Sequence, residues 1–201
     1  MGRDNQAKDR QFRRKVTREA RRASYARILI VTEGSKTEPL YLEEIRAAHQ
    51  LHSANVEVQS GQLGTAPIQV VRYAQQLFED GDLRKGIHPK SFDQVYTVFD
   101  RDDHDSYFNA IVSIPSFELW LLLHYEDIQT PIHRDEVMDR LKQHITGYDK
   151  GAGGAFVITR DRLETATQRA QALAAKFNAY TAPEPFTALH ELVTLLTTLR
   201  A

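Results

Sequence analysis

The chain has 201 residues, no cysteine and a formal net charge of −1. A chain of this length can bury a core as one domain with additions. The lack of cysteine excludes a disulfide scaffold, thiolate metal sites and cysteine nucleophiles. No apolar run approaches the roughly 20 residues that span a bilayer, so we expect a soluble, cytoplasmic protein without membrane contact.

The small net charge hides an uneven distribution. Residues 1–27 carry ten Lys/Arg and three Asp/Glu, whereas the remainder carries sixteen and twenty-four. We therefore expect residues 1–24 to be a basic N-terminal arm beside an acidic body. Such an arm gains affinity for nucleic-acid phosphates by releasing counterions. The alternatives are a solvated leader, or an arm that docks on the acidic body or on a partner.

Two apolar, β-branched runs, residues 27–32 and 94–99, predict strands buried on both faces of a parallel sheet. The turn after the first run leads into a helix whose first turn holds Glu38, which we expect to complement the helix dipole. Further elements are expected as a strand at 56–58, a helix over 68–78, a strand at 110–113 and a helix over 117–125 capped by Ser116.

This alternation favours an α/β core over residues 25–129, with a mostly parallel sheet flanked by helices. From residue 130 the pattern becomes helical, with helices expected at 134–145, 160–178 and 186–200. We therefore predict that residues 130–201 are a C-terminal helical extension packed on the core.

Both buried strands end in acidic residues. Glu33 directly follows the first strand, and Asp100 and Asp102 end the second. Ligands of an open parallel sheet bind beyond the carboxyl ends of its strands, so these carboxylates should meet if the strands are neighbours. Asp102 lies two residues past Asp100, which places both side chains on one side of an extended chain.

Converging carboxylates repel one another unless a cation lies between them. Mg²⁺ or Mn²⁺ suits such oxygen ligands, and it can activate water for phosphodiester cleavage. We therefore predict a metal centre of Glu33, Asp100, Asp102 and Asp103, of which the first three are also catalytic. The alternative is that Asp ends strands because turns favour it.

Other side chains are candidates for supporting roles. Glu118, in the first turn of an apolar helix, is predicted to be catalytic, as a ligand or a base. Lys36, His124, Tyr148 and Lys150 are candidates for binding phosphate or nucleic acid. Each has a plainer alternative, as a solvated lysine, a core histidine or part of a linker.

Several blocks of the sequence resemble the RloB-like family, also called AbiLii-like. They are residues 31–38 (VTEGSKTE), 98–104 (VFDRDDH), 115–124 (PSFELWLLLH) and 147–150 (GYDK), with a weaker match at 187–193. The Phe-Glu-Leu-Trp sequence is the specific part. Together the blocks extend from about residue 25 to the end of the chain.

That family resembles TOPRIM domains, in which a Glu after the first strand and an Asp-x-Asp after a later strand bind Mg²⁺. The resemblance implies a TOPRIM-like core and gives that metal-binding role to Glu33, Asp100 and Asp102. It also implies a part in abortive-infection defence against phage, beside an AAA-type ATPase. It does not supply a substrate, because related effectors act on tRNA or on DNA.

One departure from the family lies after the Asp-x-Asp sequence. Relatives place a helix there, whereas here only residues 106–110 precede the next strand. A crossover between parallel strands needs a dozen residues or more. Either this strand is connected unusually, or a segment near Asn109 is missing from the sequence.

Three functions remain open. The leading hypothesis is a Mg²⁺-dependent nuclease that cleaves RNA, such as tRNA, or DNA. The alternative is a non-catalytic metal-binding or regulatory subunit of an ATPase-containing defence complex. The third is nucleotidyl or phosphoryl transfer, because TOPRIM centres also serve primases. Assembly as a homo-oligomer is compatible with each.

Overall fold

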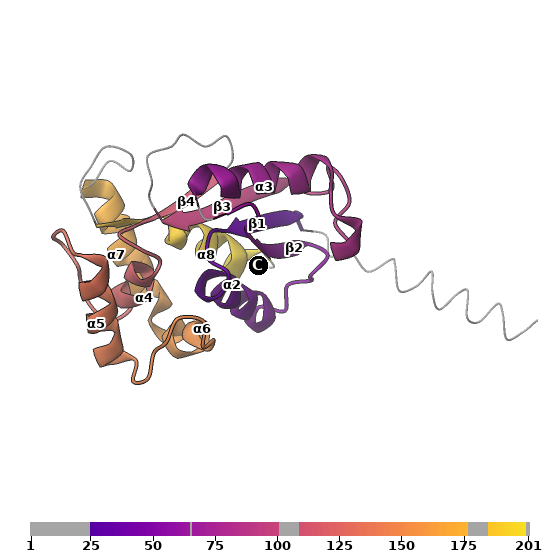
Figure 1. Ribbon diagram of the computed structural model, residues 1–201. Helices are drawn as coiled ribbons and strands as arrows, with labels where there is room; N and C mark the ends of the chain where they lie inside the picture. The colour runs from indigo at the N-terminus through magenta and orange to yellow at the C-terminus, as the bar shows by residue number, and fades with distance from the viewer. Residues whose placement is uncertain (1–24, 65, 101–108, 177–184, 200–201) are drawn as a thin grey trace, which may run out of the picture.

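The computed structural model describes residues 25–64, 66–100, 109–176 and 185–199. Within them one sheet has the strand order β2-β1-β3-β4-β5, with helices on both faces (Figure 1). The strands are β1 (Ile28–Thr32), β2 (Val56–Ser60), β3 (Gln94–Asp100), β4 (Asn109–Ile114) and β5 (Phe186–Thr187). β2, β1, β3 and β4 run parallel and β5 is antiparallel, so the predicted α/β class is confirmed.

The helices lie between and after these strands. They are α2 (Thr37–Ala48), α3 (Pro67–Glu79), α4 (Glu118–Leu123), α5 (Arg134–His144), α6 (Ala155–Thr159), α7 (Leu163–Lys176) and α8 (Leu189–Thr198), with 3-10 turns η1 (Leu83–Lys85) and η2 (Arg160–Arg162). Helix α3 covers one face of the sheet, and α2 and α8 cover the other (Figure 1). None of the helices in the described ranges is long and apolar enough to cross a bilayer.

Strand β1 separates two hydrophobic layers. Ile28 and Ile30 pack in the larger core with α2, whereas Leu29 and Val31 pack in a smaller core with α3. All four side chains are fully buried. A strand covered on both faces needs apolar residues at every position, which explains the continuous run in the sequence.

The order of the strands makes the junction of β1 and β3 a switch point of the sheet. After β1 the chain passes through α2 to β2 on one side, then through α3 to β3 on the other side of β1. Ligands of open α/β sheets bind at such points, beyond the carboxyl ends of the strands. Glu33 follows β1 and Asp100 ends β3, so both residues lie at this switch point.

The C-terminal part of the chain adds a strand as well as helices. β5 pairs with β4 through Ser113 and Thr187, whose hydroxyl oxygens are 2.9 Å apart. The helix expected over 186–200 therefore begins only at Leu189. Apolar periodicity continues through this region because both the strand and α8 are buried against the same core.

Strand β4 lies parallel to β3, with Tyr96 opposite Asn109. The strand predicted around Ile111 is thus confirmed as a member of the parallel sheet. The segment between the two strands, residues 101–108, lies outside the described residues. It contains Asp102 and Asp103.

A buried hydrogen bond joins the two helices that carry site residues. The indole nitrogen of Trp120 on α4 donates to the hydroxyl of Tyr41 on α2 at 2.8 Å, and both side chains are fully buried. The Tyr41 ring also packs edge-on against Phe117 and Phe156. These contacts hold α4 against α2.

Replacing Tyr41 with Phe should lower the free energy of unfolding by about 1–3 kcal/mol, because it leaves the buried Trp120 N–H without an acceptor. Urea unfolding followed by the fluorescence of Trp120, the only tryptophan, measures this. The control is Tyr96→Phe: the Tyr96 side chain is half-buried and its hydroxyl donates to Gln94 Oε1, so its loss should change stability by roughly 0.5 kcal/mol or less. Equal stability of Tyr41→Phe and wild type would contradict the prediction.

Candidate metal centre

Two predicted ligands, Glu33 and Asp100, meet at the carboxyl ends of β1 and β3. The Glu33 N–H donates to Val98 O at 2.7 Å, which continues the sheet ladder by one residue. The Asp100 N–H then donates to Glu33 Oε2 at 2.9 Å. Backbone and side chain together therefore hold the Glu33 carboxylate beside Asp100, as the sequence predicted.

Glu118 reaches the same place from the start of α4. Its side chain is almost completely buried. Ser116 Oγ donates to one carboxylate oxygen at 2.8 Å, and Lys150 Nζ lies 2.9 Å from the other. Ser116 was expected to cap the helix; instead the helix N-cap is Phe117, because the Ser116 hydroxyl is taken up by the Glu118 side chain.

Glu38 is a fourth carboxylate at the site, which the sequence assigned only to the helix dipole. Its carboxylate lies over Gly34, so close that a Cβ built on Gly34 would fall 2.0 Å from Oε2. Burial, then the negative charges of Glu118 and Glu33, raise the pKa of Glu38, and Lys150 opposes them. Gly34 lies two residues after the end of β1. A single glycine in a turn is a weak signal, so the approach of Glu38 was visible only in the fold.

Asp100 carries the clearest electrostatic signature of the site. Burial raises its pKa to about 7, and the charges of Glu33, Glu38 and Glu118 add to the effect. Arg134 acts in the opposite direction, with Nη2 at 3.3 Å from Asp100 Oδ2. The carboxylates are thus crowded beyond what the neighbouring cations neutralise.

This donor set suits a hard divalent cation. Mg²⁺ and Mn²⁺ prefer carboxylate oxygens, and a cation at this point would relieve the repulsion that raises the Asp100 pKa. In the described ranges no three Asp, Glu or His side chains already stand in a ligating arrangement. The predicted ligands Asp102 and Asp103 lie outside the described residues.

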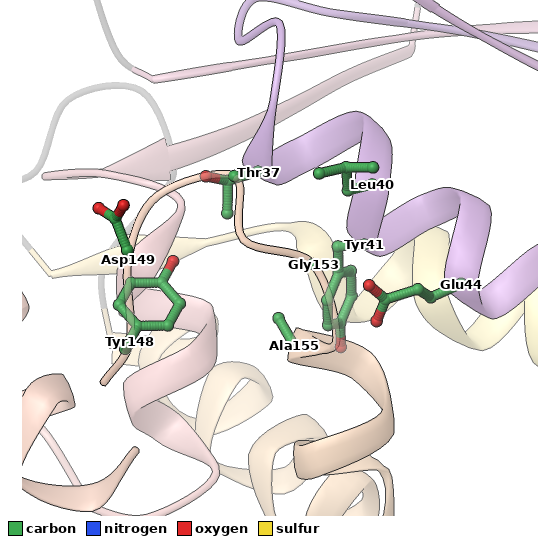
Figure 2. Close-up of a pocket in the computed structure, with 9 residues that line it drawn as sticks. Thr37, Leu40, Tyr41, Glu44, Tyr148, Asp149, Gly153 and Ala155 are labelled. Atoms are coloured by element: carbon green, nitrogen blue, oxygen red, sulfur yellow. The ribbon is translucent and has the colours of Figure 1, made fainter. Parts of the chain in front are cut away.

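A glycine-rich loop, residues 147–154, lies against the N-terminus of α2 (Figure 2). Gly151 has a φ of +79°, and a Cβ there would fall 2.6 Å from Lys36 Cβ, so the loop packs directly on the Lys36 stem. Glu44 on α2 anchors the far end of the loop, accepting hydrogen bonds from the amides of Gly154 and Phe156. A small pocket lies between the loop and the helix.

The loop supplies the predicted residues Tyr148 and Lys150. Tyr148 points toward Thr37 in this pocket (Figure 2). Burial and the nearby charge of Glu118 raise the pKa of the Tyr148 hydroxyl. Lys150 pairs with Glu118 and remains half exposed. The structure therefore brings Lys36, Tyr148 and Lys150 together through one loop, in which Lys150 contacts the Glu118 carboxylate.

His124 has a different setting from the other candidates. Its side chain is 1% exposed, its ring packs edge-on against Trp120, and Nδ1 lies 2.9 Å from Trp120 O. The carbonyl only accepts, so the proton of the neutral ring is on Nδ1. None of these contacts joins the carboxylates, and they fit a core residue.

Comparison with known proteins gives one match. Residues 28–196 fit the family described as RloB-like protein. The chain belongs to the RloB-like family. The match covers β1 through most of α8 and so includes every described residue of the candidate site. No curated protein and no solved structure matches the chain.

Neutralising Asp100 should stabilise the metal-free protein. Asp100→Asn removes one charge from the crowded carboxylates, and at pH 8 we expect a gain of about 2 kcal/mol in the free energy of unfolding. Chemical unfolding in EDTA measures it, with the exposed Asp139→Asn on α5 as the matched control. A less stable Asp100→Asn protein would show that the charge of Asp100 is already well compensated.

Burial of His124 should make the fold sensitive to acid. Burial lowers its pKa to about 4, and Arg162 and Arg169 contribute, so between pH 6.5 and 4 the unfolded chain binds the proton more readily than the folded one. Stability should therefore fall as the pH drops through this range, by about 2 kcal/mol at pH 5. Between pH 7.5 and pH 5 the free energy of unfolding should fall by about 2 kcal/mol less in His124→Gln than in the wild type.

Urea unfolding at the two pH values makes this measurement. The exposed His133→Gln serves as the control and should keep the wild-type fall. An identical pH dependence of wild type and His124→Gln would show that His124 titrates normally.

Proposed function

We propose that this RloB-like chain is a metal-dependent nuclease that hydrolyses phosphodiester bonds of RNA or DNA with Mg²⁺ or Mn²⁺. In this proposal Glu33, Asp100 and Asp102 hold the ion, and Glu118 and Glu38 stand beside it. The resemblance of the family to TOPRIM centres supports a role as an effector of abortive-infection defence, in which an AAA-type ATPase is the partner and tRNA is one candidate substrate.

The meeting of Glu33 and Asp100 at the carboxyl ends of β1 and β3 carries the proposal. The two are 67 residues apart in sequence and are joined by a hydrogen bond of 2.9 Å. Burial, then the charges of Glu33, Glu38 and Glu118, raise the pKa of Asp100 to about 7, so its charged form is unfavourable there. A cation bound at this switch point of the sheet would stabilise the charged carboxylates.

Different residues of the chain would have different roles in hydrolysis. A bound divalent ion would supply a Lewis acid and a water of lowered pKa. Glu33 is held in orientation by the Asp100 amide, and Glu118 is held by Ser116 and Lys150. Because these carboxylates are already fixed, they would need no reorganisation to hold a bound ion when a phosphodiester substrate binds.

Cations on one side of the carboxylates suit a phosphate backbone. Lys150 is half exposed beside Glu118, and Lys36 is exposed at the start of α2, where the loop packs on its stem. Tyr148, in the same loop, packs against the hydrophobic core and has a buried hydroxyl, so the two lysines are the side chains that support a contact with nucleic-acid phosphates.

The non-catalytic alternative also has an observation in its favour. Asp100 and Glu118 are each paired with a cation of the chain itself, Arg134 and Lys150. Such pairs could neutralise the carboxylates without any ion. In that case the chain would act as a binding or regulatory subunit of an ATPase-containing complex, and Mn²⁺ would leave its melting temperature unchanged.

The nuclease proposal predicts that Glu33→Gln abolishes cleavage. Gln keeps an acceptor for the Asp100 amide but removes a charged ligand, so the fold should persist while cleavage falls by at least about 100-fold. Purified protein with Mg²⁺ or Mn²⁺ is incubated with tRNA, other RNA, and single- and double-stranded DNA, with and without the neighbouring ATPase. The exposed Glu164→Gln on α7 is the matched control and should cut like wild type.

Metal binding is measured in the same preparations. Mn²⁺ should raise the melting temperature of wild type and Glu164→Gln but not of Glu33→Gln. Failure of the wild-type protein to cleave every substrate under all of these conditions would refute the nuclease proposal. A melting temperature that ignores Mn²⁺ in the wild type would favour the regulatory alternative.

A further inference from the structure

A further cation, Arg134, stands at the candidate site and was not predicted from the sequence. It is the first residue of α5. Its Nη2 donates to Asp100 Oδ2 at 3.3 Å and to Pro115 O at 3.2 Å. The guanidinium therefore touches both the end of β3 and the segment that leads to Glu118.

The position of Arg134 is unfavourable for the helix that carries it. A cation at the first helical residue opposes the helix dipole, and Asp135 and Glu136 in the same turn are the residues that suit it. Helix α5 is instead held by Val137 and Leu141, which are fully buried. Since helix stability does not explain Arg134, its contact with the site is the better explanation.

The contacts of Arg134 leave room for a ligand. Its side chain is 55% exposed while that of Asp100 is 21% exposed, so the arginine lies at the mouth of the site. Among the described residues, only Nη2 donates a hydrogen bond, although a guanidinium has five N–H donors in a planar fork. Two parallel donors of this kind match the oxygens of a phosphodiester.

Arg134 and Lys150 lie beside different carboxylates. Arg134 contacts Asp100, whereas Lys150 contacts Glu118. Because Asp100 and Glu118 are electrostatic neighbours, the two cations border one group of carboxylates. A nucleic-acid strand whose scissile phosphate lies at the carboxylates would thus have a further cation for an adjacent phosphate.

We infer that Arg134 is a substrate-binding residue that holds a backbone phosphate of nucleic acid next to the bond to be cleaved. The inference rests on the proposed nuclease function. In the absence of substrate, Arg134 holds the Asp100 carboxylate at the end of β3. The exposed pair with Asp100 is weak, so a phosphate can compete for the guanidinium.

The salt dependence of binding tests this inference. Fluorescently labelled tRNA, single-stranded RNA and duplex DNA are titrated with protein in EDTA, which suppresses cleavage, over a series of KCl concentrations. Loss of one phosphate contact lowers the slope of log K against log[salt] by about 0.7 for a single strand or about 0.9 for a duplex. We expect Arg134→Gln to show this change and to bind roughly tenfold more weakly near physiological salt.

Two further variants separate the phosphate contact from a merely structural role. Arg134→Lys keeps the charge and should keep the wild-type slope, because counterion release depends on charge. Arg160→Gln removes an arginine of similar exposure, 57%, outside the site and should keep both slope and affinity. The Mn²⁺-induced rise in melting temperature should persist in Arg134→Gln, which shows that the carboxylate site is still formed.

The outcomes distinguish this inference from the proposed function. Arg134→Gln that binds with wild-type slope and affinity overturns the inference, even if the wild type cleaves nucleic acid. Failure of the wild type to bind any of the three probes overturns it as well. Conversely, a lowered slope in Arg134→Gln supports the phosphate contact, even if the wild type cleaves no substrate and the nuclease proposal fails.

Discussion

The parallel pairing of β1 with β3 is the constraint on which the candidate site depends. Thr32 lies opposite Val98 in this register, and the Glu33 amide continues the ladder to Val98 O. The next hydrogen bond, from the Asp100 amide, is accepted by the Glu33 side chain instead of a backbone carbonyl. A shift of the register by one residue would turn Asp100 to the opposite face and separate the two carboxylates.

Electrostatic repulsion is built into this arrangement and is only partly compensated. The Asp100 pKa stays near neutrality although Arg134 is in contact with it, and Glu118 is buried with a lysine that remains half exposed. The surrounding fold supplies the energy that holds these groups, through the fully buried strand β1 and the Trp120–Tyr41 hydrogen bond between α4 and α2. Functional sites commonly combine such local strain with a well-packed support.

Sequence reasoning found the residues that come at the ends of buried strands. The apolar runs before Glu33 and Asp100 could be read because both faces of a central parallel strand need apolar residues. The roles predicted for Glu118, Tyr148 and Lys150 had weaker support in the sequence, and the structure brings these three residues together, with Lys150 in contact with Glu118 and Lys36 packed on the same loop. Nothing in the local sequence distinguishes His124 as a core residue, because its burial comes from the packing of Trp120 and the helices around it.

The positions of β1 to β4, the α/β class and the acidic residues at the ends of β1 and β3 were determined by the sequence alone, since hydrophobic periodicity and residue type are local properties. The tertiary structure decided what those residues meet. It brought Glu38 over Gly34, Arg134 to Asp100 and Lys150 to Glu118. These contacts join segments that are close only after the sheet and helices have packed. They depend on side-chain direction and helix placement, which periodicity does not encode.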